Sequence, residues 1–340
     1  MKKILLQTEN RVRRTYRGGK RLDAFLGKDI CEDTFYPEDW ISSFTEAKNK
    51  NYIKDEGISR VVVDGAKRLI TDVVSNSDFG FGRNECGVLV KLLDAGERLG
   101  IQVHPSPEFA LKHFGSSHGK TECWHIISAD DDAAVYIGFK EGITKEEWRS
   151  LYEAQDIEGM LDKLHRIKVK PSDTILVKSG TPHAIGAGCF LLEIQEPTDY
   201  TMRVEKKTVS GDTITPMQIH YGAGEDALFD CFIYEGLSEQ EATERYVIKS
   251  VEGSGEFCRK MHVTYEDTPC FALGVLSEGE SILPASFVTI VIISSGKIRI
   301  LDVDMDVKRG DKIFVPYGCG EISSVSAEAV VCYPPKMQEV

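Results

Sequence analysis

Short apolar segments separated by turn residues make up most of the chain. Runs of roughly five to eight residues rich in Val, Ile, Leu and Phe are divided by Gly, Pro, Asp and Ser, a pattern typical of β sandwiches and barrels. The predicted strands fall into an early series at 60–63, 87–94, 100–104, 122–128, 133–139, 174–178 and 189–195. A late series follows at 272–276, 287–294, 297–303, 312–315 and 329–333. The pattern predicts a mainly β protein with two barrels.

The two series define the predicted domains. Residues 1–236 are expected to form a covering segment followed by the first barrel, and residues 246–340 the second barrel. The polar stretch 235–245, which contains GLSEQEATER, is interpreted as the linker between them.

Helical spacing interrupts the strand pattern in two places. At about 143–166, Thr144 and Glu147 form a capping box ahead of apolar residues spaced three and four apart, which predicts a helical insertion. A shorter helix is expected after Ser106, which suits an N-cap, and Pro107, which suits the first helical position. This second helix would begin directly after His104.

Composition narrows the class of protein. Of 340 residues, 41% are hydrophobic and 28% charged, with a formal net charge of −13, which argues against a nucleic-acid partner. The nine cysteines show no CxxC spacing and are expected to be reduced. No apolar run approaches the length of a membrane span, and the apolar run at the N-terminus is too short for a signal sequence. A cytoplasmic protein without a membrane partner is expected.

Four polar residues near the predicted strands could hold a metal ion. Period two places Gln102 and His104 on one face of a strand, Glu122 lies in a strand after a Gly-rich loop, and His183 follows the turn SGTP. Taken singly, such polar positions more often face solvent. If the four converge, two imidazoles, a carboxylate and an amide oxygen suit Zn²⁺, or Mn²⁺, Fe²⁺ or Co²⁺. An ion with one anionic ligand keeps positive charge and can act as a Lewis acid.

Several motifs resemble those of a known enzyme family. The runs KLLDAGERLGIQVHPSPEFA, GKTECW, GTPHAIGAG and LLEIQEPTDYTMRV, within about 87–204, are similar in order and spacing to type I phosphomannose isomerases, zinc enzymes of the cupin superfamily. The resemblance implies two cupin-type barrels and one Zn²⁺ per chain, bound by Gln102, His104, Glu122 and His183. It also implies interconversion of mannose 6-phosphate and fructose 6-phosphate through a metal-stabilised enediol.

The resemblance also gives roles to two basic residues. Arg203 matches the family's active-site position, and Lys120, two residues before Glu122, would face the same pocket. Both are expected to be catalytic and to bind substrate, by stabilising developing oxyanion charge or by holding the phosphate. The base that moves the proton stays open between a carboxylate, a histidine and a metal-bound water.

Two stretches of the chain depart from the family. Relatives carry Trp-Gly-Gly where this chain has Tyr16 to Gly19, and Val-Tyr-Asp where it has Val204 to Lys206, which suggests a remodelled pocket rim. Two alternatives are therefore kept: a non-catalytic cupin that binds sugar phosphates, and an iron-dependent cupin oxygenase.

The remaining histidines are expected to be structural or exposed: His113, His118, His125, His165, His220 and His262.

Overall fold

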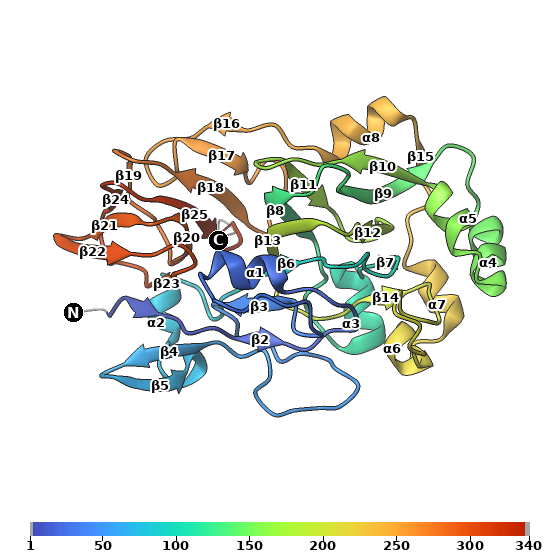
Figure 1. The fold of residues 1–340 in the computed structure, drawn as a ribbon, viewed down its shortest axis with the longest axis horizontal. Helices are drawn as coiled ribbons and strands as arrows, with labels where there is room; N and C mark the ends of the chain where they lie inside the picture. Colours follow the sequence, from blue (N-terminus) through green and yellow to red (C-terminus); the bar gives the residue numbers. More distant parts are fainter. Residues whose placement is uncertain (1–2, 337–340) are drawn as a thin grey trace.

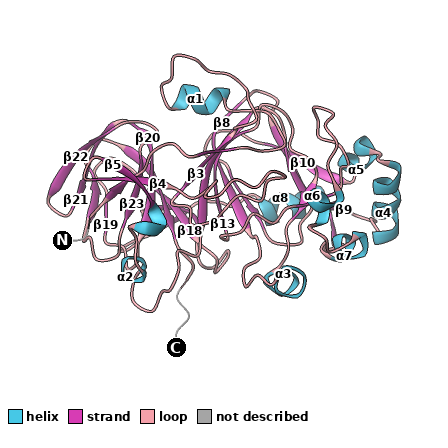
Figure 2. Ribbon diagram, turned by 90° about the horizontal axis from the view of Figure 1, so that it is seen from below, coloured by secondary structure: helices cyan, strands magenta, loops and turns pink. Residues whose placement is uncertain are grey.

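The structure, a computed structural model, describes residues 3–336 and is elongated, with β sheets along most of its length (Figure 1). Most of the helices lie toward one end, and the strands of the C-terminal third lie at the other (Figure 2). The mainly β fold predicted from the apolar pattern is confirmed. Among the described residues, no helix is both long enough and apolar enough to cross a membrane.

Two six-stranded sheets are built mainly from the early strand series. One runs in the order β10 (Leu164–Lys168), β9 (Ala134–Lys140), β12 (His183–Ile185), β7 (Gln102–Val103) and β14 (Met202–Arg203), with β15 (Gly236–Leu237) also paired to β9. The other runs β11 (Thr174–Val177), β8 (Glu122–Ala129), β13 (Cys189–Gln195), β6 (Leu89–Asp94), β3 (Glu38–Ile41) and β2 (Arg11–Val12). Both sheets are antiparallel except at β15, and each supplies residues to the candidate site.

The late series forms a second pair of sheets. The larger one has the order β1 (Leu5–Leu6), β23 (Lys312–Val315), β20 (Val288–Ser294), β25 (Glu328–Tyr333), β18 (Ala272–Leu276), β17 (Lys260–Val263) and β16 (Val251–Glu252). The smaller one has the order β19 (Ser281–Ile282), β24 (Ile322–Ser324), β21 (Gly296–Ile300) and β22 (Val303–Val307). A hairpin, β4 (Arg60–Val63) and β5 (Ala66–Leu69), stands apart.

The two pairs of sheets share buried contacts. One hydrophobic cluster contains Leu92 and Leu192 from the first pair and Phe287 and Phe314 from the second. Strand β1, at the N-terminal end, pairs with β23 of the second pair. The domain boundaries at 236 and 246 stay a prediction, since the N-terminal strand joins the C-terminal sheet.

The helices correct two sequence interpretations. The predicted insertion at 143–166 holds two helices, α4 (Lys145–Ala154) and α5 (Ile157–Asp162), and its last residues already belong to strand β10. The stretch 235–245, interpreted as the linker between the barrels, is structured, because it contains β15 and most of α8 (Glu239–Tyr246). The capping box of α8, Ser238 with Glu241, satisfies backbone donors at the helix start. The other helical segments are α1 (Lys20–Phe25), η1 (Ile70–Asp72), α2 (Asn76–Phe79), α3 (Pro107–Phe114), α6 (Pro216–His220) and α7 (Glu225–Asp230).

A buried histidine pair lies where the two pairs of sheets meet. The rings of His125, on β8, and His262, on β17, are 4.5 Å apart at their centroids. The Thr174 hydroxyl oxygen lies 3.0 Å from Nδ1 of His125 and 3.1 Å from Nδ1 of His262. Burial lowers the pKa of His125 to about 3 and that of His262 to about 4, so both imidazoles are neutral at pH 7.

This pair predicts a loss of stability in mild acid. Unfolded histidines bind a proton below about pH 6.5, whereas these two stay neutral in the folded protein, so the unfolded state binds more protons as the pH falls. The free energy of unfolding should decrease by up to about 1.4 kcal/mol per pH unit for each histidine between pH 6.5 and about 4. Urea unfolding at pH 7.5, 5.5 and 4.5 measures this slope. His262→Leu should flatten it, whereas the partly exposed control His113→Leu should not; an unchanged slope in His262→Leu would refute the assignment.

Candidate metal centre and active site

Three strands bring a histidine, a glutamate and a second histidine together. His104 follows β7, Glu122 begins β8 and His183 begins β12, and one ligand atom from each lies within 4.8 Å of the others. Glu122 Oε2 is 3.1 Å from His104 Nε2, and Glu122 Oε1 is 3.4 Å from His183 Nε2. All three side chains are at most 1% exposed. Since zinc ligands sit about 2.0–2.2 Å from the ion, and hence up to roughly 4 Å from one another, this cluster needs little movement to share one cation.

Hydrogen bonds to the backbone aim both imidazoles at this point. Nδ1 of His104 donates to the Tyr200 carbonyl and Nδ1 of His183 donates to the Thr181 carbonyl, each at 2.9 Å. These bonds leave Nε2 of each ring with its lone pair directed toward Glu122. Such partners fix the tautomer and ring orientation of metal-binding histidines.

Gln102 lies beside the cluster. Its side-chain amide nitrogen is 3.1 Å from His183 Nε2, which accepts the hydrogen bond. Rotating the amide by 180° exchanges its nitrogen and oxygen and presents Oε1 to the same point. The structure therefore brings all four predicted ligands together, and Gln102 binds an ion directly only with the amide turned.

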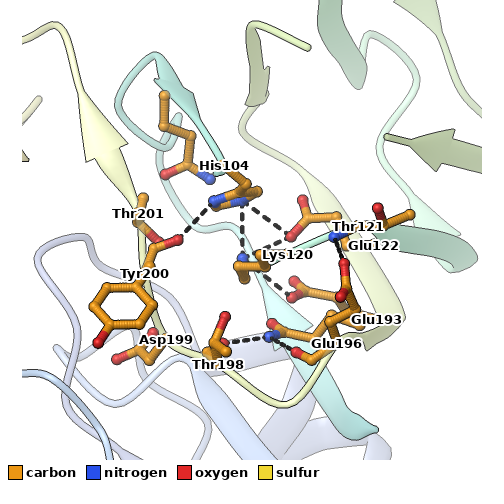
Figure 3. A network of polar contacts seen from close by, with 12 residues as sticks. His104, Lys120, Thr121, Glu122, Glu193, Glu196, Thr198, Asp199, Tyr200 and Thr201 are labelled. Atoms are coloured by element: carbon orange, nitrogen blue, oxygen red, sulfur yellow. Dashed lines mark hydrogen bonds and ion pairs between the residues drawn. The ribbon is translucent and has the colours of Figure 1, made fainter. Parts of the chain in front are cut away.

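Lys120 is the fifth polar group in the cluster. Its ammonium donates to Glu122 Oε2 at 2.6 Å and to His104 Nε2 at 2.8 Å, and lies 3.8 Å from Glu193 Oε1 (Figure 3). The loop that carries it is held by Glu196, which accepts from the Thr121 backbone N–H at 2.7 Å. A Cβ on Gly119 would lie 2.6 Å from the Pro105 carbonyl oxygen, so glycine lets this loop approach the segment after His104.

A buried network of ion pairs extends the site beyond the predicted residues. Lys91, on β6, donates to Glu193, on β13, at 3.0 Å, and lies 3.8 Å from Glu38. Arg14 donates through both terminal nitrogens to Asp199, at 2.9 and 3.0 Å. These residues were missed in the sequence. Their signal was a charge within an otherwise apolar strand, as in LVKLLD and CFLLEIQ, where every residue is buried.

Two carboxylates in the site have pKa values shifted in opposite directions. Burial alone would raise the pKa of Glu122, but the Lys120 ammonium and His104 hold it well below the usual range. Burial raises the pKa of Glu193, aided by the nearby Glu122 charge and opposed by Lys91 and Lys120. Glu122 is thus a ligand that stays ionised, whereas Glu193 takes up a proton more readily than an ordinary glutamate.

Arg203 lines the same pocket as Lys120, Glu193 and Gln102. It pairs with Gln102 across β14 and β7, and its guanidinium donates to the Thr201 and Gln218 carbonyls at 2.9 and 2.7 Å. Among residues 3–336 it has no carboxylate within ion-pair distance, so its charge is available to an anion in the pocket.

The remaining histidines lie outside the cluster. His125 and His262 form the buried pair described above, and His165 Nε2 donates to the Leu237 carbonyl at 3.0 Å. His113 stacks on Phe109 in α3, with ring centroids 4.3 Å apart. In the part of the chain that the structure describes, the cluster of His104, Glu122 and His183 is the one group of three or more such residues close enough to hold an ion.

Comparison with curated proteins finds isomerases of one kind, and no family model matches the chain. A mannose-6-phosphate isomerase of Bacillus subtilis, ManA, is 30% identical over 254 residues, which is 72% of this chain and 74% of ManA. A mannose-6-phosphate isomerase of Streptococcus mutans is 38% identical over 55% of this chain and 56% of its own length. The probable mannose-6-phosphate isomerase GmuF of Bacillus subtilis is 47% identical over 34% of this chain, and that match spans only 36% of GmuF.

Solved structures share the fold over nearly the whole chain. The mannose 6-phosphate isomerase of Bacillus subtilis has a TM-score of 0.76 at 22% identity, covering 98% of this chain and 100% of that one. A zinc-bound mannose 6-phosphate isomerase has a TM-score of 0.72 at 15% identity, with 98% and 100% covered. The likeness to these structures is one of fold, while the similarity to ManA extends over more than two thirds of both sequences. On that similarity, this chain belongs to the mannose-6-phosphate isomerase family.

Proposed function

We propose that this protein interconverts mannose 6-phosphate and fructose 6-phosphate and binds one Zn²⁺ per chain. The observation that carries the proposal is the convergence of His104 Nε2, His183 Nε2 and the Glu122 carboxylate within 4.8 Å, in a buried pocket of a family member. A solved relative of the same fold is zinc-bound, which supports zinc as the ion. The non-catalytic sugar-phosphate binder and the oxygenase are less well supported, because the relatives carry isomerase names.

The donor set fits a catalytic zinc ion. Two neutral imidazoles and one carboxylate are typical of catalytic zinc sites, and burial lowers the pKa of His104 to about 3, so that its Nε2 lone pair is free to bind a metal at neutral pH. When bound, the ion supplies a Lewis acid that makes the C–H next to a carbonyl more acidic. Lys120, which now donates to His104 and Glu122, would then be repelled by the ion and kept near Glu193.

The isomerisation moves a proton between C1 and C2 of the sugar, which requires a base. Both imidazoles of the cluster are committed, through Nδ1 to backbone carbonyls and through Nε2 to the proposed ion. Glu193 is a buried carboxylate of raised pKa that lines the pocket, and this supports a carboxylate as the base. Lys120, 3.8 Å from Glu193, would donate to the oxygen on which negative charge develops.

A coupled assay with mannose 6-phosphate, before and after treatment with a chelator, tests this function. Turnover should disappear in the chelated protein and return with one equivalent of Zn²⁺. Binding of the sugar phosphate without turnover in the zinc-loaded protein would contradict the proposal in favour of a binder. Oxygen uptake restored by Fe²⁺ would favour the oxygenase. The cytoplasmic location and the lack of a nucleic-acid partner remain predictions from composition.

A further inference from the structure

The cations that line the pocket fall into two groups. Near the metal ligands, Arg14, Lys91 and Lys120 are at most 10% exposed in their side chains, and each contacts a buried carboxylate. Arg98 and Arg203 line the same pocket and are partly exposed, and the loop residue Val209, which is 47% exposed, also lines it. Lys206, close by in sequence, is turned away, with its ammonium 4.3 Å from the centre of the Tyr152 ring.

Arg98 is held in a defined orientation by Glu205. The two terminal nitrogens of Arg98 donate to the two oxygens of Glu205 at 2.6 and 3.0 Å, and Nη1 also donates to the Leu99 carbonyl. Glu205 is 3% exposed and also accepts from the backbone N–H of Ile101 at 2.7 Å, which fixes it beside β7.

These contacts leave one edge of the guanidinium free. Arginine has five N–H donors, and the three contacts made by Arg98 use both hydrogens of Nη1 and one of Nη2. The Nε hydrogen and the second Nη2 hydrogen have no acceptor among the described residues. These two donors point the same way along one edge of the guanidinium, which is the geometry that binds two oxygens of a phosphate.

The pairing of β7 with β14 places Glu205, the partner of Arg98, near the metal ligands. Arg203 is opposite Gln102, and Glu205 lies beside Gly100, whose absent Cβ would be 3.8 Å from Glu205 Oε1. Gly100 is two residues from Gln102 along an extended chain, a displacement of about 7 Å on the same face. Gly100 itself lines the pocket, together with Gln102 and Arg98.

The substrate has its charges and its reacting atoms at opposite ends. The C1 and C2 atoms of a hexose 6-phosphate must lie at the metal ligands, so its phosphate must lie several bonds away along the pocket. Arg98 lines the same pocket as Gln102 and Glu122, and its hydrogen bonds go to Glu205 and Leu99, whereas Lys120 is within 2.8 Å of His104.

We propose that Arg98, oriented by Glu205, binds the phosphate group of the substrate through its free Nε and Nη2 edge and determines the preference for phosphorylated sugars. This inference rests on the proposed function for the identity of the sugar. The recognition of a phosphate dianion at Arg98 can be measured without turnover.

The test uses the zinc-loaded full chain with Arg98→Ala and Arg98→Lys. The second variant keeps a positive charge beside buried Glu205, and so protects the fold, but removes the paired donors. In the coupled assay, both should raise the KM for mannose 6-phosphate by about 10- to 100-fold with little change in kcat, since a ground-state contact to the non-reacting end is lost. Inorganic phosphate should raise the melting temperature of the wild-type protein and should do so far less in either variant.

The control is Arg166→Ala. Arg98 also lines a second hollow on the surface, and Arg166 lines that hollow but not the pocket of the metal ligands. This variant should keep the wild-type KM and phosphate response. Wild-type values in Arg98→Lys, or an equal loss in Arg166→Ala, would overturn the inference. If the wild-type protein shows no isomerase activity but phosphate stabilisation depends on Arg98, the proposed function fails while the phosphate site stands.

Discussion

Replacing His104 by alanine is expected to release the bound zinc and to lower kcat/KM by at least about a thousandfold. The reason is that His104 Nε2 is one of two imidazole ligands in the cluster, and changes to residues that merely support metal ligands already cost about 10- to 100-fold. Zinc content by mass spectrometry and the coupled isomerase assay measure the two effects. The loss of fold should be small, since His104 makes one backbone hydrogen bond through Nδ1, to Tyr200.

His113→Ala is the matched control for this variant. His113 lies in α3, nine residues further along the same segment, and it stacks on Phe109 rather than facing the cluster. This control should retain one zinc per chain and wild-type turnover. A His104→Ala protein that keeps its zinc and its activity would rule out the proposed ligand set.

Lys120→Met is expected to lower kcat by about 100- to 10,000-fold while the zinc stays bound. The side chain of methionine keeps most of the volume but removes the ammonium that lies near His104, Glu122 and Glu193. If Arg98 holds the phosphate, the loss at Lys120 should appear in kcat rather than in KM, because Lys120 would act on the reacting oxygens. Steady-state kinetics with mannose 6-phosphate separate the two parameters.

Lys112→Met serves as the control, since Lys112 is exposed on α3 and should be dispensable. A Lys120→Met variant with unchanged kcat and a strongly raised KM would instead place the phosphate at Lys120. Such a result would contradict both the role proposed for Lys120 and the position proposed for the phosphate.

The sequence predicts that several side chains of the candidate metal site lie close together, because their positions follow simple local rules. Gln102 and His104 share a face by the period of an extended chain, and Lys120 reaches Glu122 for the same reason. The structure assigns only Gln102–Val103 to strand β7, yet the alternation extends to His104. The family resemblance supplied the step that pattern alone could not, namely that His183 meets Glu122 across two sheets.

The rest of the site consists of contacts between residues far apart in the sequence, which local patterns do not predict. Lys91 and Glu193 are 102 positions apart and become neighbours only through the register of β6 and β13. Asp199 and Arg14 are farther apart still. Asp199 lies in the run LLEIQEPTDYTMRV, but its partner Arg14 lies outside all four runs that resemble the family. Helix α8 is hard to predict for a different reason, because its capping box lies in a polar segment with little apolar periodicity, a pattern that is also typical of a linker.

Anomalous diffraction at the zinc edge, from crystals of the protein loaded with one equivalent of Zn²⁺, tests the central claim most directly. We expect one zinc peak per chain, bounded by Nε2 of His104, Nε2 of His183 and the Glu122 carboxylate, with ligand distances of about 2.0–2.2 Å. A zinc ion bound elsewhere in the chain, or imidazoles of His104 and His183 too far apart to contact the same ion, would contradict it.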